Sequence, residues 1–413
     1  MHRLLARLCV LVLVAACTSS EAPPEPDPVE PTVGTAADSV VESPPAGPVD
    51  RLVVLDAEGR VVTMTPDGED RQLVSEDGQI AFQPIWSPDG TRVAYSTTGE
   101  SPGVGVADLG AGSVASTGTE TPVFYLYWSP AGDRLGTLRN SVAGLAFEMV
   151  TVAGKGLDMS LLDEGAPYYF AWRPDGEAVV VHVGIDRLDL LTPYSEPLEA
   201  PRPLVVQPGI FSAPQWTPRG ILAISVEGRA MLLSLLHESG DAETIAEVAG
   251  PAAFGADPAG ERVAVQTSVA GDSVSAALVE EPLETNRLHV VDTSTGESVA
   301  VTESLVAAFF WSPTGEDLLL LQVRQEDQEL QWSVWRDGEV TEGPSFLAPV
   351  TWVRDFLPFY DQYARSMTLW SPGGGRFAFP GRVGEEEGIW VHDVVAGTTE
   401  RVSDGTWVAW SHS

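Results

Sequence analysis

Trp86-Ser87-Pro88-Asp89-Gly90 is the first copy of a five-residue motif that recurs along most of the chain. Proline at the third position presets φ, and glycine at the fifth accepts the positive φ that other residues avoid. The motif therefore predicts a tight turn. Its further copies begin at Trp128, Trp172, Trp216, Ala256, Trp311, Trp370 and Trp410.

The residues around each motif predict four strands per repeat. An apolar run precedes each copy, as in 307–310, and an alternating segment follows, as in 92–96. Two further strand patterns complete each unit, for example 288–292 and 298–301. Four strands in a period of about 40–45 residues are typical of one β-propeller blade, so the sequence predicts an all-β fold.

The two ends of the repeat region complement one another. Residues 51–75 contain three strand patterns (52–55, 60–63 and 72–74) but no leading motif, whereas residues 406–411 supply only a leading strand. Joining them gives one shared blade, which closes the ring and removes exposed strand edges. We expect an eight-bladed propeller of four-stranded blades. Seven blades are the alternative, because the copy at Ala256 is degenerate and the spacings after it are longer.

Tryptophan is concentrated at the first position of the motif. Seven of the 12 tryptophans occur there. A large flat side chain at one repeated position is suited to filling the space between adjacent blades. We therefore expect these tryptophans to pack blades together rather than to stack on a ligand.

The N-terminus has the pattern of an export signal. Arg3 and Arg7 precede an apolar stretch that is too short to span a bilayer, which indicates a signal peptide at residues 1–16. The stretch ends in Val14-Ala15-Ala16-Cys17, which resembles a bacterial lipobox and implies a lipid on the Cys17 sulfur. The alternative is an ordinary secretory signal with an incidental cysteine.

The next segment is predicted to be a tether. Residues 17–49 are rich in proline and carboxylates and contain no lysine or arginine, so they can bury almost nothing. The domain prediction is a signal peptide at 1–16, a lipid-anchored tether at 17–49 and a propeller at 50–413. The anchor places the protein in the bacterial cell envelope outside the cytoplasmic membrane, on the periplasmic or extracellular face.

The charge of the chain limits its partners. Its 413 residues contain 23 Lys+Arg and 59 Asp+Glu, a net charge of -36. A phosphate binder needs a basic face, so nucleic acid is excluded as a partner. Electrostatic attraction to anionic lipids is excluded on the same ground, and the expected membrane contact is the lipid anchor alone.

The repeated motif resembles the PD40 (WD40-like) repeat of TolB-like propeller proteins, over about residues 51–413. Relatives of this type serve as interaction platforms, as sensors and as lids on prolyl-oligopeptidase hydrolases. The hydrolase role requires a further α/β domain, which residues 51–413 do not contain. The resemblance is specific for the fold and carries little information about function.

No linear motif points to catalysis or to a metal. Gly99-Glu100-Ser101-Pro102-Gly103 matches G-x-S-x-G in form, but a β segment follows it where a nucleophile elbow needs a helix. The histidines of the propeller region are scattered, so we expect no catalytic residues and no metal site. The carboxylate excess leaves Ca²⁺ as an open alternative, which no D-x-D-x-D-G loop supports, and we expect no cofactor.

Two insertions lengthen the repeat. The first, at 346–366, combines aromatic residues with Asp, Gln and Arg, which are types enriched at binding hot spots. The second, at 269–285, is the weaker candidate. We predict partner binding by the first insertion, although its aromatic residues could equally pack it onto the ring. The candidate residues are Trp352, Arg354, Phe356, Phe359, Tyr360, Asp361, Gln362, Tyr363 and Arg365.

These observations favour a lipid-anchored, extracytoplasmic propeller that acts as a protein-interaction or ligand-sensing module. The partner is expected to be a protein or a small ligand. The alternative function is a hydrolase or lyase acting on a glycan or peptide at the channel mouth. It would need acidic, basic or histidine side chains that converge at the channel. Enzymatic activity is less expected than binding.

Overall fold

The computed structural model describes residues 50–76, 78–153, 156–194, 199–204, 207–268, 283–324 and 329–412. The predicted signal peptide, Cys17 and the tether lie outside the described residues, as does most of the 269–285 insertion.

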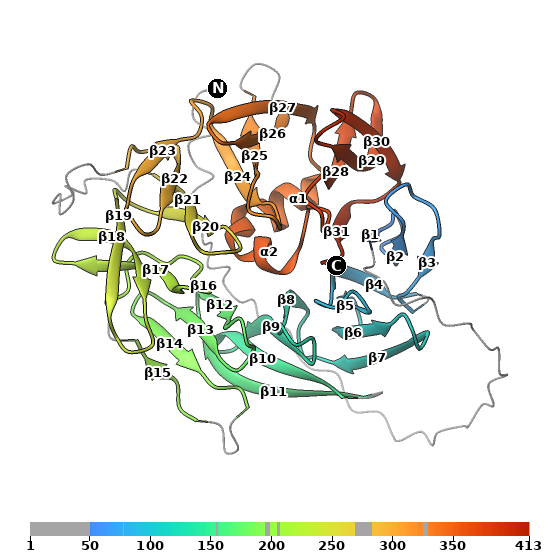
Figure 1. Cartoon of the computed structure of the whole chain (residues 1–413). Helices are drawn as coiled ribbons and strands as arrows, with labels where there is room; N and C mark the ends of the chain where they lie inside the picture. Colours follow the sequence, from blue (N-terminus) through green and yellow to red (C-terminus); the bar gives the residue numbers. More distant parts are fainter. Residues whose placement is uncertain are drawn as a thin grey trace. The chain divides into compact units, whose positions relative to one another are not determined.

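The described chain forms eight antiparallel sheets arranged in a ring, which confirms the eight-bladed propeller and excludes the seven-bladed alternative (Figure 1). The strands of the first three complete blades, from the innermost to the outermost, are β4 (Ile80–Trp86), β5 (Arg92–Thr98), β6 (Gly103–Asp108) and β7 (Ser113–Gly118); β8 (Val123–Trp128), β9 (Arg134–Ser141), β10 (Gly144–Ala153) and β11 (Gly156–Gly165); and β12 (Tyr168–Trp172), β13 (Val179–Val183), β14 (Arg187–Leu191) and β15 (Arg202–Pro203). The next three blades contain β16 (Gln215–Thr217), β17 (Gly220–Glu227), β18 (Ala230–Leu236) and β19 (Ala242–Val248); β20 (Ala252–Ala256), β21 (Arg262–Thr267), β22 (Leu288–Asp292) and β23 (Ser298–Ala300); and β24 (Val306–Trp311), β25 (Leu318–Val323), β26 (Leu330–Arg336) and β27 (Glu339–Phe346).

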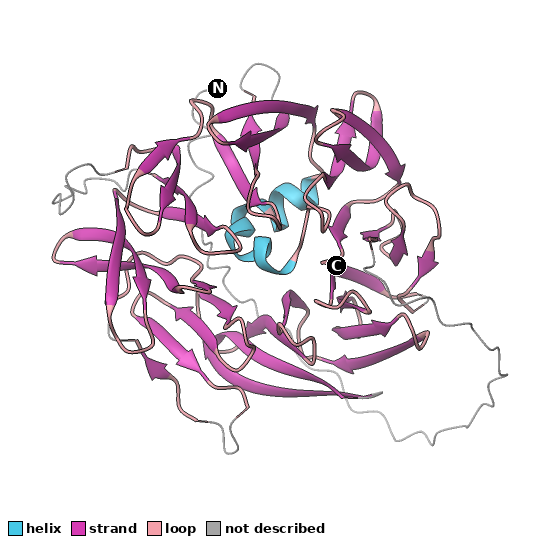
Figure 2. Ribbon diagram, in the orientation of Figure 1, coloured by secondary structure: helices cyan, strands magenta, loops and turns pink. Residues whose placement is uncertain are grey.

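The seventh blade has a shortened inner strand. Its three regular strands are β28 (Arg376–Val383), β29 (Glu386–Asp393) and β30 (Thr398–Ser403). The inner position is held by a bridge between Trp370 and Phe377 and by the bond from the Ala378 amide to the Leu369 carbonyl, 2.9 Å. Three short helices precede this inner segment: α1 (Val350–Asp355), η2 (Leu357–Phe359) and α2 (Tyr360–Ser366). Figure 2 shows these helices at the centre of the ring of strands.

The eighth blade joins the two ends of the ring, as the sequence predicts. It contains β31 (Trp407–Trp410), β1 (Leu52–Leu55), β2 (Val61–Met64) and β3 (Gln72–Leu73), in that order from the centre outward. β1 and β31 are antiparallel, with Leu52 opposite Trp410 and Leu55 opposite Trp407. All residues of both strands are buried.

The tryptophans of the motif link neighbouring blades. Each of four indole N–H groups donates to the carbonyl just before the motif position of the preceding blade: Trp86 to Ala409 (3.3 Å), Trp172 to Tyr127 (3.2 Å), Trp311 to Gly255 (2.8 Å) and Trp370 to Phe310 (3.1 Å). The first of these bonds crosses the closure of the ring. The predicted packing role of these tryptophans is confirmed, and the hydrogen bond explains why an indole suits the position.

The motif turns lie on one face of the ring, here called the motif face. A β-carbon added to Gly132 would lie 3.6 Å from Pro88, and one on Gly176 would lie 3.6 Å from Pro130, so successive turns touch. Strand direction alternates within each blade, so the connections from outermost to innermost strands lie on the opposite face, here called the insertion face. The connection from β27 to the seventh blade contains the three helices.

Candidate functional site

Residues 350–366, here called the plug, fill the centre of the ring. α2 contacts the inner strands β8, β12, β20 and β24, which belong to four different blades. Inner strands of a propeller leave backbone groups facing the channel, and buried groups of this kind need partners. The plug supplies both apolar surface and hydrogen bonds to these strands.

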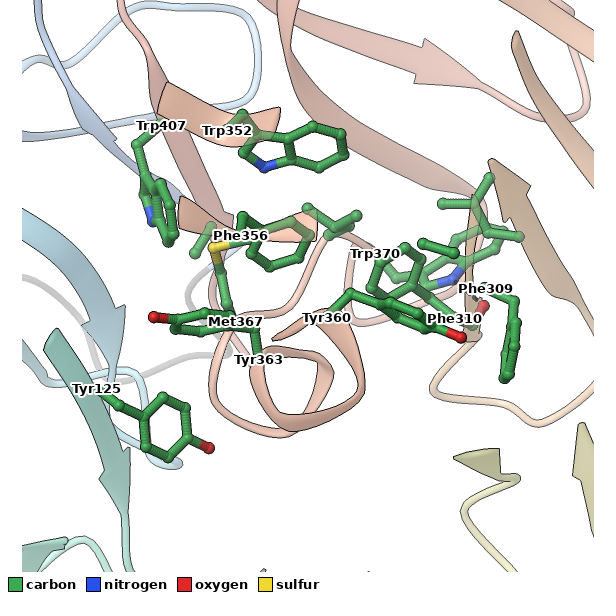
Figure 3. Packing of buried hydrophobic residues seen from close by; sticks show 14 of the residues in the cluster. Tyr125, Phe309, Phe310, Trp352, Phe356, Tyr360, Tyr363, Met367, Trp370 and Trp407 are labelled. Carbon is green, nitrogen blue, oxygen red and sulfur yellow. Dashed lines mark hydrogen bonds between the residues drawn. The ribbon is translucent and has the colours of Figure 1, made fainter. Parts of the chain in front are cut away.

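The first half of the plug is anchored by aromatic packing. Trp352 and Phe356 are fully buried one helical turn apart, with ring centroids 4.8 Å apart in a stacked arrangement. Trp352 also meets Trp332 edge-on at 6.1 Å, and Phe356 meets Trp407 edge-on at 5.8 Å. The start of the plug thus packs against the sixth blade and the closing strand together. Figure 3 shows Trp352, Phe356 and Trp407 at close range.

The second half of the plug is held by hydrogen bonds with residues of the inner strands. The Tyr363 hydroxyl donates to Phe124 (2.8 Å), the Gln362 amide to Phe170 (3.0 Å), and the Tyr125 hydroxyl to the Gln362 carbonyl (3.1 Å). The Gln83 side-chain amide also donates to the Tyr363 hydroxyl.

Two of these partners lie at irregularities of the inner strands. The pairing of β4 shifts register between Phe82 and Ile85, around Gln83, and that of β8 shifts between Val123 and Tyr125, around Phe124. Such bulges redirect backbone groups out of the ladder. At these irregularities the Phe124 carbonyl and the Gln83 side chain reach Tyr363 of α2.

The predicted binding residues therefore divide into three sets by burial. Trp352, Phe356, Tyr360, Gln362 and Tyr363 are buried in the ring, Asp361 and Arg365 are partly buried, and Arg354 and Phe359 are exposed. The buried aromatic residues pack the insertion onto the ring, as the alternative interpretation of the sequence proposes. The partner-binding role stays a prediction, and Arg354 and Phe359 are the two members that solvent reaches freely.

Two exposed valines next to them were not among the predicted residues. Val350 is 79% exposed, Val353 38% and Phe359 46%. Val350, Val353 and Arg354 are three and four positions apart and share one face of α1. We call Val350, Val353, Arg354 and Phe359 the plug surface. The apolar spacing of the valines was a signal in the sequence, but only the burial of Trp352 shows which side of the helix faces solvent.

Asp361 has an unusual electrostatic environment at the start of α2. Burial raises the pKa of its carboxyl group to about 6, although the backbone amides of Gln362 and Ala213 and the positive charge of Arg365 lower it in part. A carboxyl group whose pKa is higher in the folded state than in the unfolded chain stabilises the fold when protonated. Its contribution is complete below about pH 4 and is lost as the pH rises through about 6.

Replacing this carboxyl group with a neutral amide is expected to stabilise the protein at neutral and alkaline pH. Asp361→Asn should raise the free energy of unfolding by up to about 2 kcal/mol at pH 8 and leave it nearly unchanged at pH 4. Urea unfolding at both pH values measures the difference. An effect of the same size at pH 4 and pH 8 would contradict the assigned pKa.

Within the part of the chain that the structure describes, no three His, Cys, Asp or Glu side chains are grouped so that they could hold a metal ion. His182, in the third blade, has its Nδ1 3.0 Å from the Ser212 carbonyl. His392, in the seventh blade, has its Nδ1 2.8 Å from the hydroxyl of Thr399 on the neighbouring strand of the same blade. None of the described helices is both long and apolar enough to cross a membrane.

The formal G-x-S-x-G match, Gly99–Gly103, spans the turn between β5 and β6, so no helix follows its serine.

Comparison with known proteins identifies the fold. No protein-family model matches the chain, and no curated protein matches it. Among solved structures, a chain described as the eukaryotic initiation factor is 11% identical, with a TM-score of 0.55 over 87% of this chain and 98% of that chain.

Two further similar structures come from a bacterium and from an archaeon. TolB from Acinetobacter baumannii is 16% identical, with a TM-score of 0.39 over 72% of this chain and 64% of that chain. The β-propeller domain of the Trilobed protease from Pyrococcus furiosus is 12% identical, with a TM-score of 0.48 over 80% of this chain and 97% of that chain. The fold is a β-propeller, and its eight-bladed ring agrees with the TolB-like, PD40-type repeat that the sequence indicates.

Proposed function

We propose that this chain is a lipid-anchored binding module of the bacterial cell envelope that engages a protein partner through the plug surface. The observation that carries the proposal is the pairing of exposed and buried residues on the short segment 350–359, which contains α1 and η2. Val350, Val353 and Phe359 remain in contact with solvent, although Trp352 and Phe356 fix the same segment rigidly in the ring. Exposed apolar side chains on a rigid support lose little conformational entropy when they bind.

The first described residue lies on the face of the ring opposite the plug surface. Asp50 forms an ion pair with Arg376 (2.6 Å) and accepts a hydrogen bond from the Trp410 indole (2.5 Å), both next to motif turns. The described chain therefore begins on the motif face, whereas the plug surface lies at the insertion face.

A binding role is also favoured over the enzymatic alternative. A hydrolase or lyase at the channel would need several converging polar groups. The plug instead fills the channel centre with Trp352, Phe356, Tyr360 and Tyr363, which are buried. Asp361 is the plug carboxyl group with a raised pKa, and the hydrogen bonds to it come from backbone amides.

A photo-crosslinking amino acid at position 359 is expected to capture a protein in intact cells of the source bacterium. The matched control is position 395, because Val395 is an equally apolar and 89% exposed residue in a β29–β30 turn on the motif face. The product should fractionate with membranes, and Cys17→Ser should move it to the soluble fraction.

Two results would contradict the proposal. Crosslinks from position 395 to the same protein, with none from position 359, would exclude the plug surface as the binding site. A Cys17→Ser chain that stays with the membranes would exclude the lipid anchor.

A double variant, Val353→Ser with Phe359→Ser, tests the apolar side chains of the plug surface. It should reduce crosslinking of the partner to a photo-crosslinking amino acid at position 350, without changing the unfolding midpoint.

A further inference from the structure

A cavity of about 250 Å³ lies where the plug reaches the motif face. It is lined by Trp86, Pro88, Tyr127, Trp128, Pro130, Arg365, Ser366 and His412. These residues come from the first two complete blades, from the end of α2 and from the segment after the closing strand. The cavity is thus separated from the plug surface by the length of α2.

The charge of this cavity is opposite to that of the chain as a whole. The chain contains 59 acidic and 23 basic residues, yet the lining includes Arg365 and no carboxylate. Burial lowers the pKa of His412 to about 4, so its imidazole is neutral at pH 7 and Arg365 is the charged group of the lining. Arg365 forms no ion pair among the described residues, and its Nη2 is buried without a hydrogen-bond partner. Asp361, one turn earlier, attracts the Arg365 guanidinium electrostatically without forming an ion pair with it. The Asp361 carboxylate instead accepts hydrogen bonds from the Gln362 amide (3.0 Å) and the Ala213 amide.

A second buried donor in the lining also lacks an acceptor. The indole N–H of Trp128 has no hydrogen-bond partner. Trp86, Trp172, Trp311 and Trp370 occupy the same motif position and donate to the preceding blade. Trp410 departs from this pattern by donating to Asp50, whereas Trp128, in the cavity lining, has a buried N–H group with no acceptor. An unpaired buried N–H group costs free energy, and an unpaired guanidinium costs more, so the site is short of an acceptor.

We propose that this cavity binds a small organic carboxylate with a flat, apolar body. The planar guanidinium of Arg365 matches the two oxygens of a carboxylate, and the rings of Trp86, Trp128 and the two prolines offer flat apolar walls. The volume is just below the range of about 300–1,000 Å³ that drug-sized ligands occupy, so the ligand is smaller than these. The lack of carboxylates in the lining removes the repulsion that an anion meets elsewhere on this chain.

Calorimetric titration with sodium benzoate tests the site. We expect a Kd below about 1 mM for the unmodified chain and much weaker binding of benzamide, which has the same shape without the charge. Arg365→Met should weaken benzoate binding by at least about tenfold. It should also raise the unfolding midpoint in the absence of benzoate, because it removes a buried charge that has no partner. An arginine with a purely structural role would instead lower the midpoint when replaced.

Arg354→Gln is the matched control, because Arg354 lies on the plug surface and is paired with Asp355 at 2.6 Å. It should leave benzoate affinity unchanged. Equal benzoate binding by the Arg365→Met chain, or equal stabilisation by benzoate, chloride and phosphate, would overturn the proposal. It would also be overturned if benzoate bound only after removal of Ser413, since the end of the chain itself would then be the occupant. Each result is independent of crosslinking at position 359, so the two proposals fail separately.

Discussion

Trp352→Ala is expected to lower the free energy of unfolding by about 3–5 kcal/mol, which is a large part of the stability of a typical domain. The indole is fully buried and packs on Phe356, Trp332 and Phe346. Its removal leaves a cavity where the plug meets the sixth blade. The surrounding strands are fixed by their ladders and cannot collapse into this space, so most of the cost should be realised.

Urea unfolding followed by far-UV circular dichroism measures this effect. Trp352→Phe should cost much less, since its ring keeps the stacking on Phe356 and the lost indole N–H has no hydrogen-bond partner. Phe359→Ala, four residues from Tyr363 but exposed, should cost less than about 1 kcal/mol. Equal costs for Trp352→Ala and Phe359→Ala would show that the plug is not anchored through its buried face.

The ring itself could be predicted from the sequence because its determinants are local. Seven of the turns contain a proline and a glycine two residues apart, and a tryptophan at a fixed place links neighbouring blades at four interfaces. The strands predicted at 52–55 and 72–74 correspond to β1 and β3, and the one at 60–63 lies one residue from β2. Even the degenerate copy at Ala256 ends a regular inner strand, β20, because its proline and glycine are retained.

The location of the plug could not be predicted in the same way. The spacing of Trp352, Phe356, Tyr360 and Tyr363 has the period of a helix, and this signal was available. Whether those rings face a partner or the channel depends on the channel width and on bulges at Gln83 and Phe124, some 240–280 residues away. The cavity at Arg365 is similarly non-local, since four separate parts of the chain form its walls.

Truncation of residues 407–413 is expected to abolish the soluble, closed monomer. Trp407 and Trp410 are buried, and losing either ring alone should cost about 3–5 kcal/mol, so losing both approaches the total stability of a domain. The truncation also exposes the edge of β1, whose four residues are apolar and buried. Such an edge favours pairing between chains.

The closing strand supports more than its own blade, which is why its loss should have the largest effect. The Ala409 carbonyl accepts the indole N–H of Trp86 in the next blade, and Trp407 packs edge-on against Phe356 and Tyr363 of the plug. Size-exclusion chromatography with light scattering should show aggregates for the truncated chain and a monomer for a control that lacks only residues 412–413. A synthetic peptide of residues 404–413 added during refolding should restore part of the monomer, because it can pair with β1 in the same register. A truncated chain that stays monomeric and unfolds at the original urea midpoint would mean that the ring does not depend on its closure.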